Sequence, residues 1–192
     1  MRKLVVAITG TPGTGKSTFA KRLERKLDSC SIIEVNDVVE KDRLYSSKDR
    51  FGSKIVDIDG LEQAMKTEIK RSNARVVLVV GHLASDLNLH CDVTIVLRAK
   101  LKTLVKRFEM RDYPEGKIRE NLVAEATDYC GIISRERCAR TYEVETAADK
   151  KKIMVYISEI SRINKSREPS KKVIERMDEL LGLIENGNRF GL

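Results

Sequence analysis

The 192-residue sequence is poor in several residue types, and each scarcity narrows the class of protein. It has no tryptophan, three prolines and two histidines. No apolar run approaches the roughly 18 residues that a membrane-spanning helix needs. The four cysteines, Cys30, Cys91, Cys130 and Cys138, lie far apart and never form a Cys-x-x-Cys pair. We therefore expect a cytoplasmic protein with reduced, mostly structural thiols, no zinc site and no membrane contact.

The length and the charge distribution favour one sizeable domain that binds anions. The formal net charge is +8. Residues 1–30 carry seven basic and two acidic side chains, and residues 98–119 carry eight and three. Such concentrated positive charge predicts small phosphate-bearing ligands, and it also permits RNA or a ribosomal surface as a partner. Lysine-rich, solvated helix faces would give the same totals.

A complete phosphate-binding pattern, G-x-x-x-x-G-K-[ST], lies near the start of the chain. It reads Gly10, Thr11, Pro12, Gly13, Thr14, Gly15, Lys16, Ser17 and Thr18. An apolar run at residues 4–8 precedes it, and residues 17–27 follow with apolar positions at helical spacing. In this setting, backbone N–H groups and a helix N-terminus surround a polyphosphate. We expect Lys16 to reach the β- and γ-phosphates of ATP and the Ser17 hydroxyl to bind Mg²⁺.

Short runs with strand character along the chain predict a sheet. They lie at residues 4–8, 31–35, 76–80, 93–97 and 141–145, and the first, third and fourth of them are mostly apolar. Because these runs alternate with helical patterns, we predict an α/β fold, a P-loop NTPase three-layer sandwich with a five-stranded parallel sheet and helices on both faces, as in nucleoside monophosphate kinases. Ligands in such folds bind beyond the carboxyl ends of the strands. The phosphate loop, Asn36-Asp37 and Gly81-His82 all follow predicted strands.

Two regions complete the predicted organisation. Residues 1–163 form the domain, and residues 164–192 form a polar linker with an appended C-terminal amphipathic helix. That helix either packs on the domain or contacts a partner or second subunit.

The chain fits a small kinase better than a guanine-nucleotide switch. Residues 164–167 read Asn-Lys-Ser-Arg and lack the aspartate of the base-reading N-K-x-D pattern. Transfer of a γ-phosphoryl group needs several cations around the triphosphate. Arg107 and Arg111 are four residues apart at the end of a predicted helix, so one face can present both guanidinium groups. Salt bridges to Glu109 and Asp112 are the structural alternative for these arginines.

A further set of residues carries a family resemblance. It comprises the phosphate loop, Glu34-Val35-Asn36-Asp37, Leu44-Tyr45, Asp57, Gly81-His82, Val96-Leu97-Arg98 and Arg111-x-Tyr113-x₃-Lys117-x₂-Glu120-Asn121-x₂-Ala124-Glu125. With these residues the chain resembles, over about residues 4–163, the adenylate kinase isoenzyme 6 family, also described as the coilin-interacting nuclear ATPase family, which includes archaeal members.

The resemblance implies adenylate kinase activity, ATP + AMP ⇌ 2 ADP, together with ATP hydrolysis. It also implies a role in maturing the small ribosomal subunit, through one of its proteins near the 3′ end of the small-subunit RNA. ATP would bind residues 10–18, AMP would occupy residues 36–60, and residues 107–121 would form a lid.

Individual roles follow from the same resemblance. The acceptor pocket would include Asp37, Tyr45 and Asp57, and Arg107 and Arg111 would close over the phosphates. His82 would face the nucleotides and position water or a phosphate, although a lone histidine at a strand end is often only a structural hydrogen-bonding group. Thr146 would lie near adenine.

Val80 departs from the family pattern. Members commonly carry there an acidic residue that holds Mg²⁺ through water, and Asp37 is the best replacement. Loss of such a carboxylate can cost a factor of roughly 10–100, so we expect slow turnover.

Two other functions stay open from the sequence. The protein could be a nucleotide-gated assembly factor in which AMP phosphorylation is incidental. It could also phosphorylate another small acceptor, since nothing in residues 41–60 identifies the acceptor base.

Overall fold

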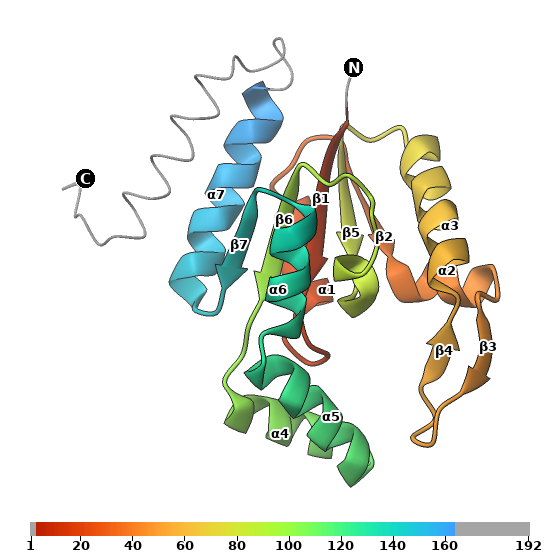
Figure 1. Ribbon diagram of the computed structural model, residues 1–192. Helices are drawn as coiled ribbons and strands as arrows, with labels where there is room; N and C mark the ends of the chain where they lie inside the picture. Colours follow the sequence, from red (N-terminus) through yellow and green to blue (C-terminus); the bar gives the residue numbers. More distant parts are fainter. Residues whose placement is uncertain (1–2, 164–192) are drawn as a thin grey trace.

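The computed structural model describes residues 3–163 of the chain (Figure 1). Its centre is a five-stranded, fully parallel sheet in the order β2-β5-β1-β6-β7. The strands are β1 (Leu4–Thr9), β2 (Cys30–Glu34), β5 (Val76–Val80), β6 (Val93–Leu97) and β7 (Thr141–Val144). The predicted α/β fold with a five-stranded parallel sheet is therefore confirmed.

Helices and one small hairpin connect these strands. The helices are α1 (Lys16–Glu24), α2 (Val35–Lys41), α3 (Ile58–Arg71), η1 (His82–Ser85), α4 (Leu101–Glu109), α5 (Glu115–Ala126), α6 (Tyr129–Arg137) and α7 (Ala147–Ile163). The hairpin pairs β3 (Tyr45–Lys48) with β4 (Lys54–Val56) in antiparallel fashion.

Two hydrophobic cores enclose the sheet, one on each face. Alternate residues of a strand point to opposite faces. Leu4, Val6 and Ile8 of β1 belong to the core that also contains side chains of α1 and α7. Val5 belongs to the core formed with α2 and α3. Because both faces are covered, every residue of β1, β5 and β6 is buried, which explains their unbroken apolar runs.

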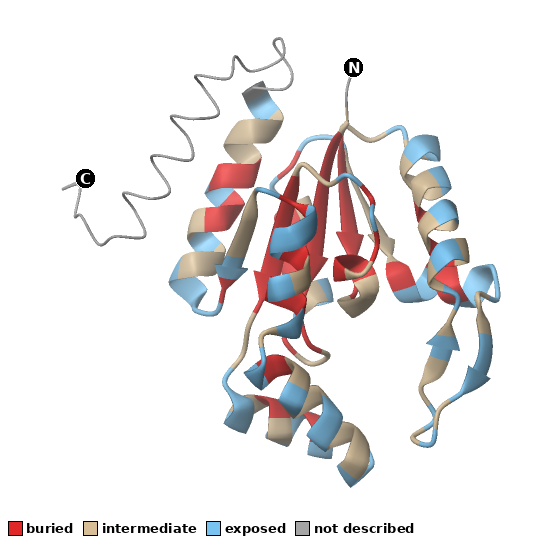
Figure 2. Cartoon of the chain, viewed as in Figure 1, coloured by how far each residue is buried: buried red, intermediate tan, exposed pale blue. Residues whose placement is uncertain are grey.

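The less buried elements gather at the carboxyl edge of the sheet. Helices α4 and α5 and the β3–β4 hairpin all project beyond this edge (Figure 1). Their residues are mostly exposed or half-buried, whereas the central strands are buried (Figure 2). The rigid sheet thus ends where the phosphate loop begins, and the projecting elements surround that loop.

The structure adds three local features that the sequence patterns did not indicate. Asn36 and Asp37 lie within helix α2, which starts directly after β2, and do not form a loop. The polar stretch after α2 contains the β3–β4 hairpin. Helix α5 ends at Ala126, and Asp128, with φ of 54°, separates it from α6.

The predicted linker and appended helix at residues 164–192 lie outside the described residues. Within residues 3–163, no helix combines the length and apolar character needed to cross a membrane.

Candidate functional site

The phosphate loop joins β1 to α1 at the carboxyl edge of the sheet, and two of its glycines are required by the backbone. Gly10 has φ of 129°, and a Cβ there would lie 2.2 Å from the Leu97 carbonyl oxygen of β6. Gly15, with φ of 96°, directly precedes the first turn of α1. Since glycine alone adopts such angles without strain, the loop can pass close to β6 and still lead into the helix.

Lys16 arches back over this loop. Its Nζ donates hydrogen bonds to the carbonyl oxygens of Gly10 at 2.8 Å and Thr11 at 3.0 Å. Burial lowers the pKa of Lys16 to about 8, and the nearby charges of Glu34 and Glu125 act in the opposite direction. A phosphate group in the loop would add negative charge and favour the ammonium form.

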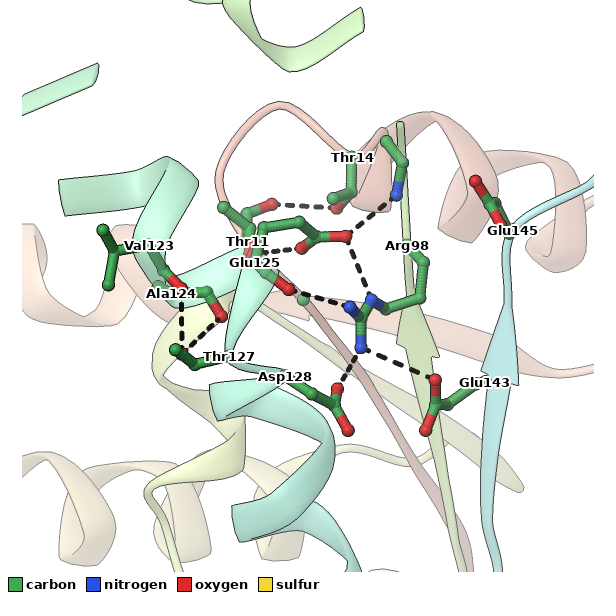
Figure 3. Close-up of polar contacts among 12 residues, drawn as sticks. Thr11, Thr14, Arg98, Val123, Ala124, Glu125, Thr127, Asp128, Glu143 and Glu145 are labelled. Atoms are coloured by element: carbon green, nitrogen blue, oxygen red, sulfur yellow. Dashed lines mark hydrogen bonds and ion pairs between the residues drawn. The ribbon is translucent and has the colours of Figure 1, made fainter. Parts of the chain in front are cut away.

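Glu125, near the C-terminal end of α5, contacts the phosphate loop at Thr11 (Figure 3). The carboxylate is 5% exposed and accepts a hydrogen bond from the Thr11 hydroxyl at 2.5 Å. Its other oxygen accepts from Arg98 Nε at 3.0 Å and from the Ala99 backbone N–H at 3.1 Å. Arg98 Nη2 also donates to the Glu125 carbonyl oxygen at 2.8 Å. One buried side chain therefore joins the phosphate loop, the end of β6 and helix α5.

Further carboxylates surround Arg98 on its other side (Figure 3). Arg98 Nη1 pairs with Asp128 and, at 3.5 Å, with Glu143. Arg135 of α6 pairs with the same two carboxylates. Such a connected network fixes the geometry of its members better than isolated exposed pairs do. The base of α5 is therefore held against the end of the sheet.

The main pocket has a volume of about 800 Å³ and opens at the carboxyl edge. The loop contributes Lys16 and Ser17, and η1 contributes His82. The facing wall comes from β2, α2, the hairpin and α5. Its lining includes Glu34, Asn36, Val39, Glu40, Ser53, Lys54, Val56, Ile58, Arg111, Tyr113, Lys117, Glu120 and Asn121.

A second pocket of about 500 Å³ lies on the other side of the loop. Its lining includes Phe19 and Arg22 of α1, Arg107 of α4, and Lys150 and Met154 of α7. The two pockets share Gly13, Gly15, Thr18 and Arg111. The phosphate loop and one arginine therefore separate two spaces, each large enough for part of a ligand.

His82 faces the main pocket from the end of β5. Its backbone carbonyl accepts hydrogen bonds from the Thr9 hydroxyl at 3.1 Å and the Ser85 hydroxyl at 3.0 Å. Burial, reinforced by the charge of Lys16, lowers the pKa of His82 to about 4. The imidazole is therefore neutral at physiological pH, and it can accept or donate a hydrogen bond without adding charge.

The two predicted lid arginines occupy different positions. Arg107 lies on α4, and its Nη1 donates to the Gly13 carbonyl oxygen. Helix α4 ends at Glu109, so Arg111 lies in the following turn. Both line the second pocket, but only Arg111 also lines the main one. A parallel stack of Phe108 on Tyr113, with ring centroids 5.4 Å apart, holds this turn against α4.

Comparison with known proteins identifies the family. The AAA domain model matches residues 6–128, which is more than half of the chain. The chain belongs to the AAA domain family.

Archaeal relatives match over most of their length. A Methanococcus maripaludis protein is 33% identical over 187 residues, covering 95% of this chain and 100% of the relative. A Methanocaldococcus jannaschii protein is 33% identical over 171 residues, covering 88% and 91%. Both bear the name "Putative adenylate kinase". These matches establish the broader family and not the narrower isoenzyme 6 group.

Solved structures share the fold of this AAA domain protein. Shikimate kinase from Bacteroides thetaiotaomicron aligns with a TM-score of 0.53 at 15% identity, covering 82% of this chain and 97% of that one. Shikimate kinase from Acinetobacter baumannii, in complex with shikimate, also has a TM-score of 0.53, at 17% identity, covering 86% and 96%. At such low identity the likeness concerns the fold alone.

Four residues that the family resemblance implied do not line either pocket. Asp37 is exposed on α2. Asp57 begins α3, and its carboxylate accepts from the Gly60 N–H at 3.0 Å. The Tyr45 ring lies 3.8 Å from the ammonium group of Lys54. Thr146 precedes α7 and exchanges hydrogen bonds with Asp149. Their roles at the ligand stay predictions.

Sequence reasoning missed four other residues that the AAA domain fold brings to the site. Glu34 and Lys54 line the main pocket, Met154 lines the second, and Glu125 supports the loop. Glu34 and Glu125 belong to the residue patterns that carry the family resemblance, but no role followed from them. Met154 lies among the apolar residues of α7, where nothing in the sequence separates a pocket residue from a core residue.

Proposed function

We propose that the protein is an adenylate kinase-type phosphotransferase that catalyses ATP + AMP ⇌ 2 ADP. The observation that carries this proposal is the pair of pockets that meet at the phosphate loop and Arg111. A transfer between two nucleotides needs this arrangement, because both phosphate chains must meet while their bases point apart. The names of the archaeal relatives support the same reaction.

In this proposal the second pocket receives the adenine of ATP. Phe19 and Met154 form an apolar base beneath this pocket and are themselves buried, whereas the exposed guanidinium groups of Arg22 and Arg107 can stack on a planar base. The triphosphate then follows the loop, where the backbone N–H groups and Lys16 bind it.

The main pocket receives AMP, and its two ends suit the two ends of that molecule. Val39, Val56 and Ile58 form an apolar wall for the base. The charge of Arg111 acts on Lys16 and that of Lys117 acts on His82, so both can supply positive charge for the phosphate. The Lys117 ammonium group sits 4.5 Å from the centroid of the Tyr113 ring, a cation–π contact that fixes its position. Residues 36–60 thus act as the acceptor region and residues 107–121 as the lid.

Phosphoryl transfer itself requires positioning and charge stabilisation. As the bond from the γ-phosphorus to the leaving oxygen of ADP breaks, an AMP phosphate oxygen attacks on the opposite side. Negative charge spreads over the equatorial oxygens, where Lys16 and Arg111 stabilise it. Arg107 assists by holding the Gly13 carbonyl and closing the base pocket. The chain supplies no covalent nucleophile in this scheme. Water can compete with AMP for the phosphoryl group, so exclusion of water by the lid limits the hydrolysis of ATP.

The residues present fit a magnesium ion that is bound mainly by phosphate oxygens. Residues 3–163 contain no group of three or more histidine, cysteine or acidic side chains that could hold a metal ion alone. Mg²⁺ commonly keeps several waters and uses one or two protein oxygens together with phosphates. Ser17, in the first turn of α1, can supply its hydroxyl. When bound, the ion would neutralise charge on the β- and γ-phosphates.

Two finer proposals follow from the sequence. Slow ATP hydrolysis without AMP would result if His82 positions a water in the partly open pocket. A role in maturation of the small ribosomal subunit, with a ribosomal protein or RNA as partner, stays a prediction, as does a purely nucleotide-gated assembly factor.

A coupled assay for ADP tests the proposed reaction. Purified protein with Mg²⁺ and ATP should form ADP much faster when AMP is added. Lys16→Ala should lower this rate by about 10²-fold or more, because the variant loses a charge-assisted contact to the transferring phosphate. Equal rates with and without AMP would reject the proposal, and a panel of other small acceptors would then identify the substrate.

A further inference from the structure

Three carboxylates line the main pocket, and two of them already have partners. Glu40 pairs with Lys54. Glu120 pairs with Arg50 at 3.2 Å. The Glu34 carboxylate makes no hydrogen bond and no ion pair within residues 3–163. Its charge nevertheless acts on Lys16, so the carboxylate lies near the ammonium group that serves the phosphates. Glu34 is therefore the lining carboxylate that the protein's own contacts leave available.

The strand register explains why Glu34 reaches this position. Glu34 is the last residue of β2 and pairs with Val80, the last residue of β5. Val80 in turn pairs with Ile8 of β1, two residues before the phosphate loop begins at Gly10. Val80 is fully buried and apolar. Strand β5, which pairs with β1, thus ends without a carboxylate. Strand β2, on the other side of β5, supplies a carboxylate at the same register position.

Asp37 occupies a different place. It is exposed, lies in the first turn of α2 and is absent from the lining of the main pocket. Glu125, the other carboxylate that influences Lys16, has both oxygens engaged by Thr11, Arg98 and Ala99. Neither side chain is as free as Glu34 to face a ligand.

A free carboxylate beside a triphosphate site has a definite electrostatic consequence. Two negative groups repel each other across a partly buried pocket, where water screens them poorly. A divalent cation between them replaces this repulsion with attraction on both sides. Mg²⁺ prefers oxygen ligands and often keeps a water between itself and a carboxylate. Such a carboxylate makes nucleotide binding depend on the metal.

We propose that Glu34 holds the Mg²⁺ of bound ATP through water, in place of Asp37. The proposal rests on the proposed function only in placing a triphosphate on the loop; it does not depend on AMP as acceptor. Glu34 discourages metal-free ATP and selects the magnesium complex, and Ser17 would supply a protein hydroxyl to the same ion.

Calorimetric titration of the full-length protein tests this role through binding alone. The dissociation constant for ATP is measured with Mg²⁺ and with EDTA, and the ratio of the two gives the gain from magnesium. Glu34→Gln removes the charge at almost constant size. It should tighten metal-free ATP binding severalfold and reduce the magnesium gain by about tenfold. Glu34→Asp keeps the charge on a side chain that is one methylene shorter. Its magnesium gain should lie between those of the wild-type protein and Glu34→Gln.

Two further variants act as controls. Asp42→Asn removes an exposed carboxylate that follows α2 outside the pocket, and it should keep the wild-type magnesium gain. Asp37→Asn tests the rival ligand. A wild-type gain in Glu34→Gln, or a lost gain in Asp37→Asn alone, would overturn the proposal. Thermal melting without nucleotide confirms that each variant is folded.

The result is separable from the proposed reaction. If Glu34→Gln loses the magnesium gain while the wild-type protein forms no ADP from AMP, the metal role stands and the acceptor is wrong. If ADP forms from AMP but the gain is unchanged in Glu34→Gln, the reaction stands and the metal role fails.

Discussion

Two of the three glutamates of helix α5, Glu120 and Glu125, lie five positions apart in opposite environments. Glu125 is buried and bonded to Thr11 and Arg98, whereas Glu120 has a side chain 53% exposed and pairs with Arg50, which is 77% exposed. The first contact joins the helix to the phosphate loop, and the second joins it to the tip of the hairpin. The comparison separates a buried end of α5, which we call the fixed end, from an end held by exposed contacts, which we call the adjustable end.

Gly116 marks the adjustable end of the same helix. A Cβ there would lie 2.2 Å from the edge of the Phe51 ring at the hairpin tip. The hairpin tip and α5 therefore approach each other at the Phe51 ring and at the exposed Arg50–Glu120 ion pair. If residues 107–121 close as the proposed lid, the movement should pivot about the Glu125 end, because a buried network holds that end.

The largest expected effect comes from breaking the fixed end. Glu125→Ala leaves Arg98 with fewer partners and the Thr11 hydroxyl without an acceptor. We expect a loss of about 2–3 kcal/mol in the free energy of unfolding, less than for a fully buried pair because Arg98 retains Asp128 and some solvent contact. ATP affinity should fall by about tenfold. Urea denaturation and calorimetry measure the two quantities, and unchanged values would show that the network does not support the loop.

Acid titration probes His82, which lines the main pocket. The pKa of His82 is lowered by burial from 6.5 to about 4, so the unfolded chain takes up a proton first as pH falls. The stability associated with neutral His82 is complete above about pH 6.5 and is lost as pH falls towards 4. The loss should reach about 2–3 kcal/mol.

His82→Asn provides the comparison for this titration. The variant should show a shallower decline in the free energy of unfolding between pH 6.5 and 4. Parallel curves for the two proteins would mean that other groups account for the acid sensitivity.

A smaller effect is expected at the adjustable end from Gly116→Ala. Alanine favours the helix by about 0.5–1 kcal/mol, so stability should not fall. The added methyl group should displace Phe51 and hinder closure over the acceptor, which would raise the KM for AMP severalfold and leave ATP binding unchanged. Combining it with Phe51→Ala removes the clash and should restore part of the loss. A normal KM in Gly116→Ala would show that this contact plays no part in closure.

The smallest effect should follow from Glu120→Ala, the counterpart of Glu125→Ala on the same helix. Its ion pair with Arg50 is exposed, so we expect a change within about 0.5 kcal/mol in the free energy of unfolding. The pair should weaken further with added salt. A loss as large as that of Glu125→Ala would remove the contrast between the two ends.

The sheet was largely predictable because its three central strands, β1, β5 and β6, are buried on both faces. The apolar runs at residues 76–80 and 93–97 coincide with β5 and β6, and the other three strands differ by one residue at one or both ends. Helix α2 was missed because it has seven residues, too few to show a helical period, and follows β2 without a loop. The hairpin was missed because its short strands are mostly exposed and polar.

The site was predictable where a local pattern fixes the chemistry and not where distant segments meet. The phosphate loop is contiguous, so Lys16 and Ser17 followed from spacing alone. Glu34 needs the register between β2 and β5, and Glu125 needs its contact with Arg98, 27 residues away. Asp37 was chosen because it follows a strand in the sequence, but the helical turn that begins at Val35 carries it away from the pocket lining.

The central claim is that two nucleotides bind on either side of the loop with their phosphates meeting at Lys16 and Arg111. Diadenosine pentaphosphate, which joins two adenosines through five phosphates, tests it by calorimetry. The account predicts that one molecule binds each chain, more tightly than ATP, and abolishes the binding of both ATP and AMP. Binding no tighter than that of ATP, with AMP still able to bind the saturated protein, would contradict it.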